Sequence, residues 1–370
     1  MLAASDELAA WLRLAASGLG PDRQRSLLAA FGLPQHIFEA GRAAIAGVVG
    51  RAAADVLAAP PDPERIEPAL AWAAEDGNHI LCLADEAYPH ALLDIADPPV
   101  LLYAKGELAL LQRPALAVVG ARSATAQGAA NAEAFARALS EPGLTIVSGL
   151  ALGIDAAAHR GALDGGAGGT IAVIGTGADR IYPARNAALA REIAARGLVL
   201  SEFPLGTPPL RHNFPRRNRL IAGLAGGVLV VEAALGSGSL ITARLASDSG
   251  REVFAIPGSI HSPLSKGCHR LIRDGAKLVE TAEDVLEELR GPLGQAFAAP
   301  APACAAPARP GPEADEESAR LLNALGHDPV DLDTLVQRSG LTVDALYAIL
   351  LPMELGGQLA RLPGGRVQRL

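Results

Sequence analysis

Short blocks of Val, Ile and Leu alternate with helical segments through the middle of this 370-residue chain. In a sheet with one solvent-exposed face, apolar and polar residues alternate along each strand. These blocks lack that alternation, so they predict strands that are covered on both faces. We expect strands at 79–83, 115–119, 144–147, 170–174, 198–201, 227–231 and 252–256. We expect helices at about 127–139, 153–163, 184–195, 240–249 and 266–274. This alternation predicts an α/β fold, a Rossmann-like doubly wound parallel sheet, over residues 79–290.

Residues 1–78 have a different pattern, which predicts a helical domain of four or five helices. SGLG at 17–20 and GVVG at 47–50 each lie between two helical stretches. Such units resemble the helix-hairpin-helix (SAM-like) modules, whose glycines let backbone amides approach phosphates. The same glycines also suit simple packing hairpins, so contact with DNA is one of two interpretations here.

The end of the chain predicts a separate small domain. Residues 291–313 are rich in Pro and Ala, a composition typical of an extended linker. Beyond it, residues 314–370 predict helices from about Glu316, Asp331 and Thr342 and a terminal hairpin from Leu359, which together make a winged helix. The third helix, 342–355, has no Lys or Arg, so we expect it to contact protein or a second copy rather than the major groove of DNA.

Charge is unevenly distributed along the chain, whose formal net charge is -8. Residues 1–80 and 311–370 each carry -4, and the residues between them are neutral. This balance argues against a protein that coats DNA through bulk charge, but a local basic patch can still bind an anion because charges are screened over about 10 Å. The three cysteines are far apart, which favours neither disulfides nor a metal site. With no signal-like or membrane-spanning run, we expect a cytoplasmic protein without membrane association.

The basic patch is the segment RHNFPRRNRLIAGL at 211–224. Four arginines and a histidine lie within nine residues, with no acid among them. Phe214 and Asn218 lie among the cations, and an apolar stretch at 220–231 follows, which predicts a helical turn and then a buried strand. Arginines pair with phosphates and an aromatic ring can stack on a base, so the segment suits single-stranded nucleic acid. A solvated arginine-rich loop is the alternative.

Small-residue turns follow four of the predicted strands. They are GARS at 120–123, SGLALGID at 148–155, GTG at 175–177, and the segment from Glu232 through GSGSLITAR at 236–244. Because the carboxyl ends of parallel strands meet at one edge, amide donors and helix N-termini would converge there, which suits phosphates.

The chain lacks the common nucleotide-binding motifs. Neither GxGxxG nor GxxxxGK[ST] occurs, so we expect no cofactor and no P-loop ATPase. Asp155 and His159 lie four residues apart without a nearby nucleophile, which favours a helix cap and a packed histidine over catalysis. Tyr182, followed by Pro183, is interpreted as a turn anchor. We therefore expect no catalytic residues and no metal site.

Taken together, eight motifs resemble one family. VVGAR, SGLALGIDAAAHRGAL, TGADRIYPARN, SEFPLG, NFPRRNRLIAGL, VVEAALGSGSLITARLA, FAIPGSI and GCHRLIRDGA occur in the order that is found in DprA, also called Smf, the DNA-processing family of natural transformation. The resemblance covers about residues 85–290. It implies a recombination mediator that binds and protects incoming single-stranded DNA, forms a homodimer, and helps load the recombinase RecA against single-strand-binding protein. It also implies that the protein is not an enzyme.

The resemblance also implies a DNA pocket. Carried over by position, that pocket consists of Gly120, Arg122, Ser148, Gly149, Arg211, Phe214, Arg217, Asn218, Gly238 and Ser239. The arginines would hold phosphates, Phe214 would stack on a base, and Ser148 and Gly149 would supply turn amides.

Two other functions fit the sequence less well. Nucleotide-processing hydrolases of the lysine-decarboxylase-like class share this kind of sheet, but they carry a PGGxGTxxE signature that is missing here. A transcription regulator would need a basic recognition helix, which the helix at 342–355 does not provide.

Overall fold

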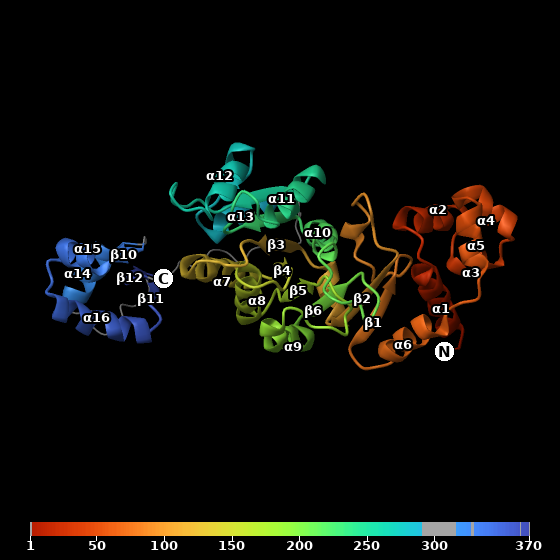
Figure 1. The fold of residues 1–370 in the computed structure, drawn as a ribbon, viewed down its shortest axis with the longest axis horizontal. Helices are drawn as coiled ribbons and strands as arrows, with labels where there is room; N and C mark the ends of the chain where they lie inside the picture. Colours follow the sequence, from red (N-terminus) through yellow and green to blue (C-terminus); the bar gives the residue numbers. More distant parts are fainter. Residues whose placement is uncertain (1, 291–315, 327–328, 363, 370) are drawn as a thin grey trace. The chain divides into compact units, whose positions relative to one another are not determined.

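The computed structural model describes residues 2–290, 316–326, 329–362 and 364–369. The chain divides into two compact units, and the smaller one contains the elements from α14 onward (Figure 1). The predicted linker, 291–313, lies outside the described residues. Treating 1–78 and 79–290 as separate domains stays a prediction, because both ranges fall largely within the larger unit.

A nine-stranded sheet forms the centre of the larger unit (Figure 1). Its strands are β1 (Asn78–Cys82), β2 (Leu101–Gly106), β3 (Ala115–Val119), β4 (Thr145–Ser148), β5 (Thr170–Val173), β6 (Leu198–Ser201), β7 (Gly227–Val230), β8 (Glu252–Ala255) and β9 (Lys277–Leu278). The spatial order is β1-β2-β6-β5-β4-β3-β7-β8-β9. Strands β3 to β9 pair in parallel, which confirms the predicted doubly wound core.

Two strands depart from the prediction. β2 was not predicted, and it pairs antiparallel with both β1 and β6, so the sheet is mixed. The two-residue β9 was also not predicted. The N-terminal helices pack against the added strand β2. Trp11 of the first helix and Trp72 of the sixth helix lie in the same apolar cluster as Tyr103 of β2.

Helices cover both faces of the parallel strands. They are α7 (Ala126–Ser140), α8 (Ile154–Gly165), α9 (Ala187–Arg196), α10 (Asn213–Leu224), α11 (Ser239–Asp248), α12 (Lys266–Arg273) and α13 (Ala282–Leu289), with short 3-10 turns η1 (His90–Leu92), η2 (Leu108–Gln112) and η3 (Ala184–Asn186). Residues of β5 alternate between the two faces: Ile171 and Val173 share an apolar cluster with residues of α10, whereas Ala172, with Ile174 just after the strand, shares a cluster with residues of α8 and α9. The sheet is therefore buried on both sides, as its uninterrupted apolar runs indicate.

The basic segment is a helix rather than a loop. The prediction placed a helical turn only near Leu220, but α10 begins at Asn213 and includes three of the four arginines. Pro215 is its third residue, where a missing N–H leaves no helical hydrogen bond unmade. α10 is the crossover that carries the chain from β6 to β7.

Six helices precede the sheet. They are α1 (Leu2–Ala16), α2 (Pro21–Phe31), α3 (Pro34–Glu39), α4 (Arg42–Val49), α5 (Arg51–Ala58) and α6 (Pro63–Ala73), around a core that includes Leu14, Leu27 and Ile37. Gly47 lies within α4, so the second Gly-x-x-Gly segment is not a turn as a whole. The assignment to the helix-hairpin-helix class stays a prediction.

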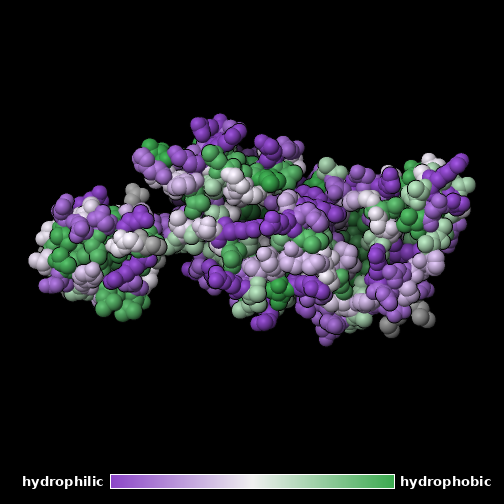
Figure 2. All heavy atoms as spheres, viewed as in Figure 1, coloured by the Kyte–Doolittle hydropathy of each residue, from purple (hydrophilic) through white to green (hydrophobic). Residues whose placement is uncertain are grey.

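The smaller unit has the helices and hairpin of a winged helix. It contains α14 (Glu316–Leu325), β10 (Val330–Asp331), α15 (Leu332–Ser339), α16 (Val343–Leu355), β11 (Leu359–Leu362) and β12 (Arg366–Arg369). The three strands pair in the order β10-β12-β11. An apolar stripe of Val343, Tyr347, Leu351 and Leu355 lies exposed along α16, and hydrophobic side chains are visible over this helix in Figure 2.

Among the described residues, no helix combines the length and the apolar character needed to cross a bilayer. On the larger unit, Figure 2 shows hydrophilic and hydrophobic side chains interspersed on the visible face.

The contact between α7 and α8 depends on a glycine. A Cβ at Gly161 would collide with the backbone carbonyl of Glu133, whereas a Cβ at the exposed Gly47 meets nothing within 4 Å. We expect Gly161→Ala to lower the free energy of unfolding by about 1–3 kcal/mol through overpacking. Gly47→Ala, the matched control, should leave stability unchanged or raise it by up to about 1 kcal/mol, because Ala favours a helix. Denaturant unfolding measures both, and equal effects would contradict the close contact.

Candidate nucleic-acid interface

A cavity of about 760 Å³ opens at the carboxyl ends of the central strands. The strand order reverses there, because the chain continues from β3 toward β4 on one side and reaches β7 on the other. This switch point is where open α/β sheets bind ligands. Its lining comes from the turns after β3, β4 and β5, from α10, and from the start of α11: Val119, Gly120, Arg122, Ala151, Asp155, Tyr182, Pro209, Arg211, Phe214, Pro215, Arg217, Asn218, Ile221, Ser237, Gly238, Ser239, Ile241 and Thr242.

Eight of the ten residues that the resemblance assigns to the pocket line this cavity. Ser148 and Gly149 do not. The eight come from separate turns and helices, and the fold brings them to one place.

Two exposed arginines of the cavity have no ion pair with a carboxylate among the described residues. They are Arg122, after β3, and Arg211, just before α10, and both are exposed. The guanidinium carbon of Arg122 lies 5.6 Å from the ring centre of Phe214, within cation–π range. These cations remain available to an anion.

An aromatic pair lies beside them. The ring centres of Tyr182 and Phe214 are 5.6 Å apart with an interplanar angle of 47°. Tyr182, at the bend before Pro183, is 43% exposed, so its ring is accessible from solvent. The sequence signal for an exposed ring at this position was the presence of an aromatic residue in a polar turn, in a chain with only 4% aromatic residues. The pair provides a surface on which a base can stack.

Arg217 has a different role from Arg122 and Arg211. Its side chain is buried, and Nη1 donates to the carbonyl of Gly149 at 2.7 Å and also to the carbonyl of Val173. Burial lowers the pKa of Arg217 to about 10, and the charge of Asp155 opposes that shift. Arg217 therefore ties α10 to the ends of β4 and β5 at the cavity that it also lines, and its role as a phosphate clamp stays a prediction.

Ser148 and Gly149 do not line the cavity, and both are engaged in hydrogen bonds within the protein. The Ser148 hydroxyl donates to the carbonyl of Val118 at 2.6 Å, and the Gly149 amide donates to the Asp155 carboxylate at 3.1 Å. The amide expected to meet a phosphate already has a partner within the protein. A Cβ at Gly149 would collide with the Arg217 guanidinium, so glycine is required where the turn crosses this side chain.

Asp155 organises the turn after β4 from the first turn of α8. Its carboxylate also accepts from the amide of Ala151 at 3.3 Å. Burial raises its pKa, while Arg217 and the two amide donors act in the opposite direction. The carboxylate therefore holds the turn before α8 and is not the helix cap that was predicted, because the N-cap of α8 is Gly153.

His159 supports the same turn from below. Its Nε2 accepts from the amide of Leu150 at 3.3 Å, and Nδ1 lies 2.7 Å from the hydroxyl of Thr170. That hydroxyl donates to the carbonyl of Ile146, so the Nδ1–H donates to Thr170 in a neutral ring. Burial lowers the pKa of His159 to about 3.

The other two arginines of α10 are paired with acids. Arg216 lies 3.4 Å from the Glu202 carboxylate, and Arg219 bonds to the same carboxylate, whose side chain is almost fully buried. Arg219 also lies 3.6 Å from Asp97, which in turn pairs with Arg25 on α2. This network links α10 to the N-terminal helices and leaves less cationic character for a ligand than the sequence indicates.

The small residues of the cavity allow close approach. A Cβ at Gly120 would lie 2.6 Å from Cγ1 of Ile154 and 2.9 Å from the carbonyl oxygen of Glu232. Gly238 precedes α11, Ser239 begins it, and the Asn218 amide donates to the Gly238 carbonyl at 3.4 Å. The N-terminus of α11 thus opens on the cavity beside α10, a position that favours negative charge.

Two family models match the chain. That of the DNA recombination-mediator protein A matches residues 79–290, and that of the DprA winged helix domain matches residues 305–365.

Individual relatives agree with the family models. Protein Smf of Escherichia coli is 44% identical over 309 residues, which cover 82% of this chain and 80% of that protein. The X-ray structure of DNA processing protein A from Streptococcus pneumoniae is 44% identical with a TM-score of 0.66, covering 75% of this chain and 95% of that one. A structure of DNA processing protein A from Helicobacter pylori, described for its single-stranded DNA binding mode, is 33% identical with a TM-score of 0.53, covering 58% and 96%.

The buried His159 makes stability depend on pH. Its pKa is lower in the folded chain than the unfolded value of about 6.5, so the unfolded state takes up the proton first and stability falls as pH drops below about 6.5. Between pH 7 and pH 5 this one group should remove about 2 kcal/mol. Urea unfolding of the wild type and of His159→Gln measures the effect. The variant should lose about 2 kcal/mol less over this range, and parallel pH profiles would contradict the buried neutral ring.

Proposed function

The chain belongs to the family of the DNA recombination-mediator protein A, as the resemblance predicted, and from this premise we propose that it binds single-stranded DNA in the cavity at the carboxyl ends of β3 and β7. The observation that carries the proposal is one juxtaposition. Arg122 and Arg211 are exposed and have no ion pair with a carboxylate within the described residues, and they line the same cavity as the aromatic pair of Tyr182 and Phe214. Cations for the backbone and rings for the bases are the two parts that a site for unpaired DNA needs.

The arrangement favours a single strand over a duplex. Stacking on Phe214 and Tyr182 requires a base whose face is free, which a duplex does not offer. Phosphate contacts and stacking are possible with every base, so we expect little sequence preference. The relative from Helicobacter pylori, described for its single-stranded DNA binding mode, supports the same ligand class.

We further propose that the bound strand is protected and passed to RecA during natural transformation, against single-strand-binding protein, by a homodimer of this chain. The family membership supports this role in recombination. In the winged helix, α16 has no Lys or Arg and exposes an apolar stripe, which supports contact with protein rather than with DNA. The location expected for this role is the cytoplasm.

A role without catalysis is also part of the proposal. Asp155, which lines the cavity, and His159, on the same helix, are both held by internal hydrogen bonds. Nothing at the cavity favours the alternative of a nucleotide hydrolase. Incubation with nucleoside monophosphates should release no free base, and release would restore that alternative.

Arginine and aromatic variants should affect DNA binding in different ways. Arg122→Ala and Arg211→Ala should each weaken oligothymidine binding and reduce the slope of log affinity against log salt by about 0.7, because each loses one phosphate contact. Phe214→Ala should cost about 1–3 kcal/mol of binding and leave the slope unchanged, because stacking releases no counterions. Fluorescence anisotropy across a salt series measures both quantities.

The control is Arg191→Ala on α9, an exposed arginine that does not line the cavity. It should bind like the wild type. If Arg122→Ala and Arg211→Ala also match the wild type in affinity and in slope, the cavity is not the DNA site.

The proposed mediator role has its own test. The wild type should speed RecA filament formation on DNA covered with single-strand-binding protein, and Phe214→Ala should do so less in proportion to its weaker DNA binding. Filament growth can be followed by RecA ATP hydrolysis. Normal DNA binding without any stimulation would refute the RecA role while leaving the DNA site intact.

A further inference from the structure

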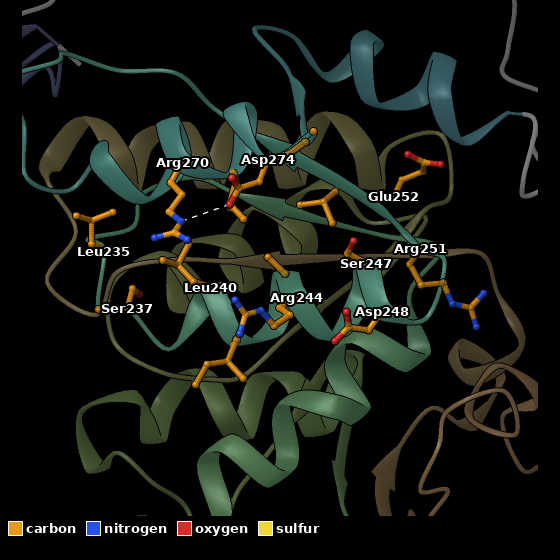
Figure 3. A pocket seen from close by; sticks show the side chains of 17 residues that line it. Leu235, Ser237, Leu240, Arg244, Ser247, Asp248, Arg251, Glu252, Arg270 and Asp274 are labelled. Carbon is orange, nitrogen blue, oxygen red and sulfur yellow. Dashed lines mark hydrogen bonds and ion pairs between the residues drawn. The ribbon is translucent and has the colours of Figure 1, made fainter.

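A second cavity, of about 690 Å³, lies beside the first on the other side of α11. Its walls come from α11 and α12 and from the segments that flank them (Figure 3). The two cavities share Ser237 and Ile241, so they meet at the start of α11. A flexible chain that leaves the first cavity there would reach the second directly.

Charge divides the second cavity into two ends. Leu235, Ser237 and Arg270 with its partner Asp274 lie toward the end nearest the first cavity, Arg244 points toward that end from the middle of α11, and Asp248, Arg251 and Glu252 lie toward the other end (Figure 3). Arg251 is already engaged, since it donates to the carbonyl of Ala91 and pairs with Asp94 at 3.3 Å. The far end therefore repels phosphates, and only the near end suits an anion.

Arg244 is the cation at the near end that has no ion pair or hydrogen bond from its side chain within the described part of the chain. It is exposed on α11. Arg270, from α12, pairs with Asp274 at 3.4 Å, but both side chains are 61% exposed. An exposed pair of this kind contributes about 0–1 kcal/mol, so a phosphate can compete for Arg270.

Exposed apolar side chains lie next to these arginines. Leu235 is 60% exposed and Ile241 is 45% exposed, and both line the second cavity. Exposed apolar side chains next to cations suit a strand of nucleic acid. The apolar side chains can contact the faces of the bases, and the cations can bind the phosphates.

We propose that the single strand continues out of the first cavity, over Ser237 and Ile241, into the near end of the second, where Arg244 binds a backbone phosphate. This extension rests on the proposed DNA-binding function and adds a second subsite to it. The first cavity, of a size that holds a drug-sized ligand, takes only a short stretch of the strand. Short oligonucleotides fill the first cavity alone, and longer ones fill both.

Oligonucleotide length separates the two subsites experimentally. The wild type, Arg244→Gln and Leu235→Ser are compared on dT6 and dT20 by fluorescence anisotropy. On dT6 all three should bind equally. On dT20 we expect Arg244→Gln to bind about three- to tenfold more weakly, with a salt slope smaller by about 0.7, because one phosphate contact is lost. Leu235→Ser should weaken dT20 binding without changing the slope, since it removes an apolar contact only.

The matched control is Arg191→Gln, which removes the same charge from α9, away from both cavities. It should match the wild type on both oligonucleotides. Unchanged dT20 binding by Arg244→Gln would overturn the extension, and so would an equal loss on dT6, which would assign Arg244 to the first cavity. If the wild type binds neither oligonucleotide, the proposed function itself fails, an outcome distinct from these two.

Discussion

The site depends on the position of one buried guanidinium. Arg217 reaches from α10 beneath the turn after β4 and bonds to the carbonyls of Gly149 and Val173. Those two carbonyls lie at the ends of neighbouring parallel strands, so a single side chain fixes the crossover helix against the edge where the ligand binds. Asp155 holds the same turn from α8 through two amides, and the opposite charges of Asp155 and Arg217 lie close enough to affect each other's pKa. Removing either partner would leave an uncompensated charge in the interior, which is costly.

This arrangement divides the arginine cluster into structural and available members. Arg217 is bound to backbone carbonyls, and Arg216 and Arg219 share Glu202. Arg211 and Arg122 are the exposed cavity arginines, and neither has an ion pair with a carboxylate among the residues that the structure describes. The structural arginines hold α10 in place, and through Asp97 and Arg25 they also connect it to the N-terminal helices. A dense run of cations in a sequence therefore overstates the charge that a ligand meets, because burial and pairing remove part of it.

The sequence predicted the parallel core because its signal is strong: strands covered on both faces are nearly continuous runs of Val, Ile and Leu, as in Ala115–Val119. β2 was missed because its pairing with β6 is decided by distant contacts rather than by local pattern. α10 begins at Asn213, before the helical turn predicted near Leu220, because a run of arginines lacks the apolar periodicity that indicates a helix. Eight of the ten pocket residues meet at one cavity, because strand-to-helix turns of a parallel sheet share an edge. The sequence could not predict the direction of each side chain, because that depends on packing. Examples are the inward direction of Arg217, the occupied amide of Gly149 and the exposure of Tyr182.

The central claim is that an unpaired strand lies in the cavity between α10 and the start of α11, with phosphates on Arg122 and Arg211 and a base against Phe214 and Tyr182. A crystal structure of the protein with an oligothymidine tests it most directly. The account predicts electron density for the strand in this cavity, with at least one base stacked on the aromatic pair and Arg217 still bonded beneath the turn. A strand bound on another surface, with the cavity empty of DNA, would contradict it.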